Sequence, residues 1–116
     1  MSSIEPTEAA ALDLRTCRPR PMEATLGGYP WLPRMIDKAR AARAGTLGPY
    51  VHPCPIDRTC LALLGLDAHE FGDVVERQRS DDAVLAALQD RGIRSPSQAW
   101  FDPLALEAQL QRSAAR

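Results

Sequence analysis

The chain has 116 residues, of which 45% are hydrophobic and 25% are charged, as is usual for one soluble globular domain. Its formal net charge of -1 provides no overall field that would attract nucleic acid or a membrane surface. The charge is unevenly spread, because seven cations lie between Arg15 and Arg43, whereas acids outnumber arginines from residue 61 onward. This uneven distribution is typical of solvated helix faces and also of a local anion-binding site.

The amino-terminal residues carry no basic region and no apolar core of the kind found in a secretory signal. No stretch approaches the roughly 20 apolar residues of a membrane span. The cysteines, Cys17, Cys54 and Cys60, are odd in number, which argues against a disulfide framework. We therefore expect a cytoplasmic protein with no membrane segment.

The chain is predicted to form a mobile tail over residues 1–11 and a single helical domain over residues 12–112. Residues 13–30 contain three prolines and the pair Gly27-Gly28, so we expect an extended, irregular segment. A long irregular segment in a small domain usually wraps over the core or carries function.

The first predicted helix begins at Leu32 or Pro33 and ends near Ala44, with Gly45 as a left-handed cap. Its apolar stripe includes Met35 and Ile36, and a second, exposed face is expected to carry three charged residues: Arg34, Asp37 and Lys38.

Four further helices are predicted after a proline-rich connector over residues 48–55. One begins at Pro55 and stops at Gly65, and the next is capped by Asp67 with Glu70 in a capping box. Gly72, inside that helix, suggests the close approach of a neighbour. Ser80 caps the fourth helix, which ends near Gly92, and Asp102-Pro103 opens the last. No alternating run of strand length is present, so the sequence predicts an all-α domain of about five short helices joined by proline and glycine corners.

Residues 27–40 read GGYPWLPRMIDKAR. This run resembles the GGYxWLPRxIDKAR signature of a bacterial family of small domains of unknown function. The similarity continues through residues 44–48, 64–71 and 82–85, and it covers about residues 12 to 110. Pro30 departs from the usual pattern, in which a bulkier apolar residue stands there. The resemblance implies a fold rather than an activity.

The same run is the candidate site. Arg34 and Lys38 are one helical turn apart, Asp37 can orient either cation, and the helix amino terminus favours anions. An aromatic ring there could stack on a planar ligand group. We therefore assign ligand binding to five residues: Trp31, Arg34, Asp37, Lys38 and Arg40. The alternative is that the aromatic residues are core anchors and the charges form an ordinary surface pair.

Other chemistry is weakly signalled. His52, Cys54 and Cys60 lack the close ligand pair of a zinc site, so neither a metal nor a cofactor is expected. Cys54 and His52 alternate along an extended segment, which would point them apart and argues against a cysteine nucleophile, and Cys60 fits the core. The last two helices could mimic a helix-turn-helix, but their acidic character argues against nucleic acid.

The sequence thus favours a non-catalytic module that binds a protein surface or a small anion, as a monomer or a homodimer. The alternative is a small enzyme acting on a phosphate- or carboxylate-bearing molecule. A pocket lined by the candidate residues would favour the enzyme, whereas an exposed apolar patch beside them would favour the interaction module.

Overall fold

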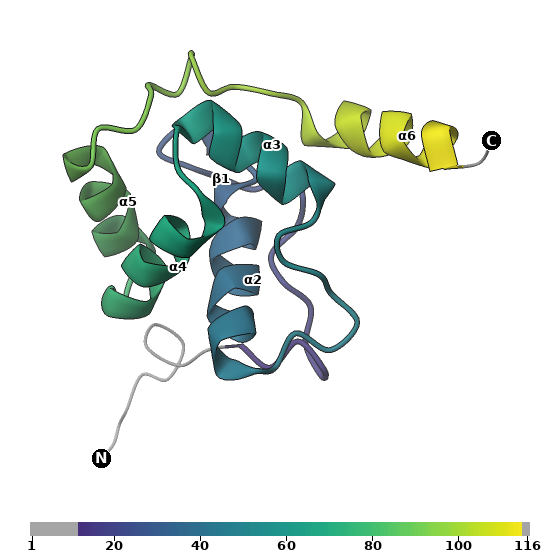
Figure 1. Ribbon diagram of the computed structural model, residues 1–116, viewed down its shortest axis with the longest axis horizontal. Helices are drawn as coiled ribbons and strands as arrows, with labels where there is room; N and C mark the ends of the chain where they lie inside the picture. Colours follow the sequence, from purple (N-terminus) through teal and green to yellow (C-terminus); the bar gives the residue numbers. More distant parts are fainter. Residues whose placement is uncertain (1–11, 115–116) are drawn as a thin grey trace.

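The computed structural model describes residues 12–114, so the tail predicted over residues 1–11 lies outside the described residues. Five helices and one short hairpin make up this part of the chain (Figure 1). In order, they are β1 (Thr25–Leu26), β2 (Tyr29–Pro30), α2 (Leu32–Ala44), α3 (Pro55–Leu64), α4 (Ala68–Arg77), α5 (Asp81–Asp90) and α6 (Pro103–Ala114). The predicted all-α fold of about five short helices is confirmed.

Local capping chemistry sets the helix ends. Gly45 and Gly65 end α2 and α3 in the left-handed region, with φ of 74° and 90°, which glycine adopts without a Cβ clash. Asp67 and Glu70 form the predicted capping box of α4, and the Ser80 side chain caps α5. These predicted boundaries are confirmed. Each depends on residues only a few positions apart, so the local sequence was enough to predict it.

Helix α2 is the centre of the core. It contacts α4 and strand β1 of the hairpin, and eight of its thirteen residues are buried. At the α2–α4 contact, a Cβ on Gly72 would come within 2.5 Å of the Arg43 guanidinium. The close approach predicted at this glycine is therefore confirmed.

The segment before α2 wraps along this helix, as predicted. Leu14 is buried and its N–H donates to the Thr46 carbonyl at 2.9 Å. The end of the segment differs from the expectation of irregular chain, since β1 and β2 pair antiparallel. Gly27 and Gly28 both have positive φ, 59° and 86°, which is the requirement of a tight hairpin turn. The strands have two residues each, too few for an alternating pattern.

The molecule measures 53 × 33 × 22 Å. Helix α6 extends away from its body, beyond α3 (Figure 1). Pro103 is its one buried residue. None of the helices in residues 12–114 has the length and apolar character needed to cross a bilayer.

Candidate functional site

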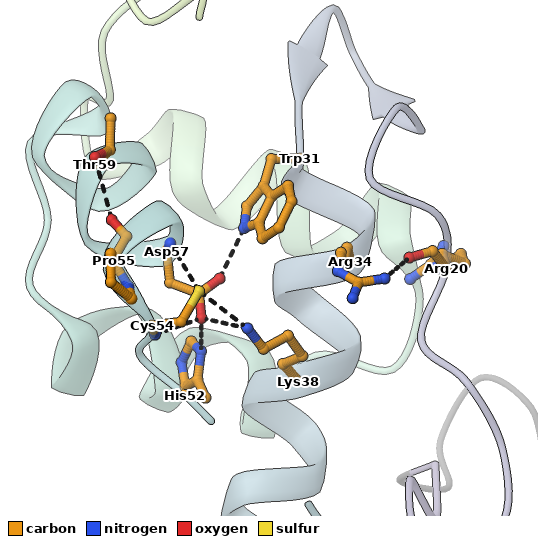
Figure 2. Close-up of polar contacts among 9 residues, drawn as sticks. All are labelled: Arg20, Trp31, Arg34, Lys38, His52, Cys54, Pro55, Asp57 and Thr59. Carbon is orange, nitrogen blue, oxygen red and sulfur yellow. Dashed lines mark hydrogen bonds and ion pairs between the residues drawn. The ribbon is translucent and has the colours of Figure 1, made fainter. Parts of the chain in front are cut away.

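The carboxylate of Asp57 is the centre of a buried polar cluster (Figure 2). Its side chain has 0% exposure. Oδ1 accepts a hydrogen bond from Trp31 Nε1 at 2.7 Å. Oδ2 accepts from Lys38 Nζ at 2.8 Å, from His52 Nδ1 at 3.0 Å and from the Cys54 N–H at 3.0 Å. We call these five residues the Asp57 cluster.

Burial by itself would raise the pKa of Asp57. The hydrogen bond from His52, the positive charge and hydrogen bond of Lys38 and the Cys54 N–H outweigh that effect, so the pKa lies well below the ordinary carboxyl value. Asp57 is therefore an anion within the core, held by its donors.

Three segments of the chain build the cluster. Trp31 directly precedes α2 in the left-handed region, with φ of 71°, a conformation costly for a bulky residue. Lys38 lies seven positions later, which places it on the same helix face. Asp57 is in the first turn of α3, where it forms a capping box with Cys54.

The prediction that Asp37 and Lys38 lie on an exposed face of the helix is wrong. Each is 4% exposed, and they have different partners: Lys38 binds Asp57, while Asp37 accepts from Arg20 at 3.0 Å. Arg20 also pairs with Asp81 at the start of α5. The wrapped segment that carries Arg20, together with α3, covers this part of α2, which the pattern within the helix could not indicate.

The expected separation of His52 and Cys54 is also wrong. The His52 ring bonds Asp57, and the Cys54 Sγ lies 3.3 Å from Lys38 Nζ. Both side chains therefore belong to one cluster, because residues two positions apart in an extended segment lie on the same face and both of them bond Asp57. Cys60, in contrast, is buried as predicted.

Arg34 is held between two aromatic rings. Its guanidinium carbon lies 5.4 Å from the Trp31 ring centroid and 5.8 Å from that of Tyr50. Nη1 donates to the Arg20 carbonyl at 3.0 Å, whereas Nε is buried with no partner among residues 12–114. Lys38 Nζ lies 5.7 Å from the Trp31 ring centroid. The ring expected to stack on a ligand thus has cations of the chain itself beside it.

Arg40 lines two hollows on the other side of α2. The smaller, of about 360 Å³, is lined by Arg40 and by the end of α4 with the connector that follows. Its charged lining consists of four arginines and one carboxylate: Arg40, Arg43, Arg77, Arg79 and Glu76. We call this hollow the arginine hollow.

The larger hollow, of about 640 Å³, has a nearly balanced lining. Its charged residues are four arginines and three aspartates: Arg18, Arg20, Arg40, Arg79, Asp37, Asp81 and Asp82. Arg40 and Arg79 line both hollows, so the two meet along these side chains.

The Arg40 guanidinium is partly buried and donates to the Gln78 carbonyl at 3.1 Å. Burial lowers its pKa and nearby Arg20 adds to the effect, although Asp81 and Asp37 oppose it. Within residues 12–114, Arg40, Arg77 and Arg79 form no ion pair, whereas Arg43 pairs with Asp73 and Glu76. Three of the four arginines that line the arginine hollow therefore have no ion pair among the described residues.

The five residues predicted to bind a ligand thus divide among four environments. Trp31 and Lys38 belong to the Asp57 cluster, Asp37 is paired with Arg20, and Arg34 is held between rings. Arg40 lies at the hollows. The sequence reasoning missed Asp57, whose signal was Pro55 and an acid in the first turn of α3. It was overlooked because Cys54 is not among the usual capping residues.

Within residues 12–114, no group of three or more histidine, cysteine or acidic side chains is arranged to hold a metal ion. In the Asp57 cluster, the Lys38 ammonium supplies the positive charge beside the carboxylate.

The chain was also compared with known proteins. No curated protein matches it. A family model, however, matches residues 16–109, which include every helix except the end of α6. That family is described as a domain of unknown function, DUF5069. The chain therefore belongs to the DUF5069 family.

Proposed function

We propose that this domain is a non-catalytic binding module for a small anion that carries a phosphate or carboxylate group. The arginine hollow supports this proposal, because four guanidinium groups and one carboxylate line a single concavity. Guanidinium groups recognise phosphate and carboxylate oxygens through paired hydrogen bonds. A bound anion would also offset the repulsion among these arginines.

The dimensions of the hollow agree with a small ligand. Its volume of about 360 Å³ falls at the lower end of the range for small-molecule sites, roughly 300–1,000 Å³. The larger hollow is less suited to an anion, since three aspartates share its lining. The proposal keeps Arg40 from the predicted site and replaces its buried members with Arg77 and Arg79.

The enzyme alternative requires a reactive group beside the ligand. The residues that line the arginine hollow include no serine, threonine, cysteine, histidine or lysine. Its one carboxylate, Glu76, is paired with Arg43, which favours binding over catalysis. We further propose a cytoplasmic location. Cys17, Cys54 and Cys60 are all free thiols, and a reducing compartment keeps thiols in this state.

Titration calorimetry with inorganic pyrophosphate tests the proposal. We expect saturable binding at about 20 mM salt that weakens at about 200 mM, since screening reduces contacts between exposed charges. Arg79→Gln should lower the affinity about tenfold, the effect of losing one charge-assisted hydrogen bond.

Arg112→Gln is the matched control, because Arg112 is exposed on α6 and the change removes the same charge away from the hollow. It should alter the affinity by less than about twofold. Absence of saturable heat at low salt, or equal losses in the two variants, would refute the proposed function.

A further inference from the structure

The two hollows differ in charge on either side of the arginines that they share. Arg40 and Arg79 line both. The residues that line only the arginine hollow include two arginines and one acid, whereas those that line only the larger hollow include two arginines and three acids. A molecule that spans both hollows would therefore meet an excess of positive charge at one end and of negative charge at the other.

Arg20 does not cancel the negative charge of the larger hollow, because two carboxylates share it. Its Nη2 donates to Asp37 Oδ1 at 3.0 Å and to Asp81 Oδ1 at 3.1 Å. The Asp37 side chain is 6% exposed, so the packing around it fixes its position. One guanidinium group carries a single positive charge against two carboxylates, and these three side chains together therefore keep one negative charge.

Asp82 adds a third carboxylate to the same hollow. It follows Asp81 in the first turn of α5 and is exposed. None of the ion pairs within residues 12–114 includes Asp82 or Arg18, the remaining arginine on this side. The carboxylate of Asp82 is therefore available to a cation that enters the larger hollow.

The larger hollow also has an apolar lining. Leu12 and Leu26, both of intermediate exposure, contribute to it. Short methylene segments of a ligand would pack against these leucines and leave water, which is favourable. The larger hollow, of about 640 Å³, thus offers room, an apolar surface and acidic side chains to a group attached to an anion in the arginine hollow.

We propose that the ligand of this domain is dipolar, with an anionic group and a primary ammonium group joined by a short methylene chain. Arg40, Arg77 and Arg79 bind the phosphate or carboxylate. The ammonium group lies in the larger hollow, where Asp81 and Asp82 accept its N–H groups, since each carboxylate oxygen can accept more than one hydrogen bond. This inference rests on the proposed function and narrows the ligand class to aminoalkyl phosphates and amino acids.

A short chain suffices because the two charged regions are close together. Burial lowers the pKa of Arg40, and the carboxylates of Asp81 and Asp37 oppose this effect, so they lie near its guanidinium group. An ammonium group beside them would also offset the negative charge that Arg20 leaves on this pair. Pyrophosphate has no cationic group to place there, so it uses only part of the site.

Two phosphate esters test the ammonium group by itself. Aminoethyl phosphate and propyl phosphate are nearly equal in size and end in an ammonium and a methyl group, respectively. In titration calorimetry at about 20 mM salt, we expect aminoethyl phosphate to bind about threefold more tightly, as one exposed ion pair would give. A site that recognised only the anionic group would bind propyl phosphate at least as tightly, because its net charge is more negative.

Variants of two aspartates on α5 assign this preference to the larger hollow. Asp82→Asn should lose the preference for aminoethyl phosphate, because the carboxylate that pairs with the ammonium group is gone. Asp90→Asn is the matched control and should keep the preference, since Asp90 is exposed at the other end of the same helix and lines neither hollow. Arg77→Gln should weaken the binding of both esters by a similar factor, because Arg77 lines only the arginine hollow.

The outcomes separate this inference from the proposed function. If pyrophosphate does not bind, the proposed function is refuted and the dipolar ligand with it. If pyrophosphate binds but the native chain does not prefer aminoethyl phosphate, the dipolar ligand is refuted and anion binding stands. An equal preference in Asp82→Asn and Asp90→Asn would likewise overturn it, and would leave Asp82 as a complement to the helix dipole only. If Asp82→Asn does not fold, the comparison of the two esters in the native chain still decides.

Discussion

Asp57 illustrates how one buried charge organises distant parts of the chain. Its carboxylate receives donors from Trp31, Lys38, His52 and Cys54, which together offset the cost of removing it from water. A buried ion pair adds little net stability compared with a well-packed apolar pair, yet loss of one partner is costly. We therefore expect the cluster to fix one arrangement of α2, α3 and the intervening loop.

The pH dependence of the unfolding free energy in an Asp57 variant tests the role of this buried carboxylate. Because folding lowers the pKa of Asp57, its stabilising contribution is complete above the unfolded pKa, about 4, and declines as the pH falls below it. We expect Asp57→Asn to lower the unfolding free energy at pH 7 by about 3–5 kcal/mol. Its stability should also depend less steeply on pH than that of the native chain below pH 4. Urea unfolding from about pH 2 to about pH 7 measures both effects, and parallel pH profiles would contradict the role given to Asp57.

The indole N–H of Trp31 can be tested separately from its packing. Trp31→Phe keeps an aromatic ring but leaves Asp57 Oδ1 without its donor, so we expect a loss of about 1–3 kcal/mol. Trp31→Ala should cost about 3–5 kcal/mol, because Trp31 is 2% exposed. Trp100→Phe is the matched control, since Trp100 is 62% exposed, and it should change stability by less than about 0.5 kcal/mol. Equal denaturant midpoints for the two phenylalanine variants would show that the buried hydrogen bond adds nothing.

Among the structural elements, the wrapped segment before α2 has the largest influence on the candidate site. It brings Arg20 to Asp37 and covers a face of α2 that the helix pattern alone would leave exposed. It also runs against the chain that leaves α2, where a Cβ on Gly48 would lie 2.9 Å from the Leu14 carbonyl oxygen and from Arg15 Cα.

Two glycines after α2 measure this packing. Gly45 and Gly48 have similar positive φ, 74° and 61°, but a Cβ on Gly45 would meet nothing within 4 Å. Gly45→Ala should therefore cost about 1–2 kcal/mol, the strain of a left-handed non-glycine residue. Gly48→Ala should cost about 1–3 kcal/mol more, because backbone atoms must move. Thermal or urea unfolding gives the comparison, and equal losses would show that the segment does not pack closely there.

Over the whole molecule, burial is concentrated on α2 and sparse on α6. Eight residues of α2 are buried, against one of α6, and α6 projects from the body (Figure 1). A helix with few buried residues can fray without global unfolding, so this difference in burial sets how readily each helix opens locally.

Hydrogen exchange should follow this distribution. We expect the hydrogen-bonded amides of α2, from Met35 onward, to exchange only through global unfolding, and those of α6, from Leu106 onward, to exchange at least about tenfold faster. Amide exchange measured by NMR in the native protein provides the test. Protection of α6 equal to that of α2 would mean that α6 is covered in solution by something other than this chain.

The sequence by itself determined the helices and most of their ends. Pro33, Gly45, Ser80 and the Asp67–Glu70 box act on backbone groups within a few residues, so local chemistry suffices to predict them. It also drew attention to the run from Trp31 to Arg40, because aromatic and charged residues are concentrated there. The short hairpin was missed, since two-residue strands carry no periodicity.

The tertiary structure alone decided where those charged side chains go. Asp37 binds an arginine 17 positions earlier, and Lys38 binds an aspartate 19 positions later. Neighbours in the sequence thus have separate partners, because the wrapped segment and α3 approach α2 differently. Such pairs depend on how distant segments pack, which the pattern within one helix cannot encode. The arginine hollow and the Asp57 cluster arise from that packing.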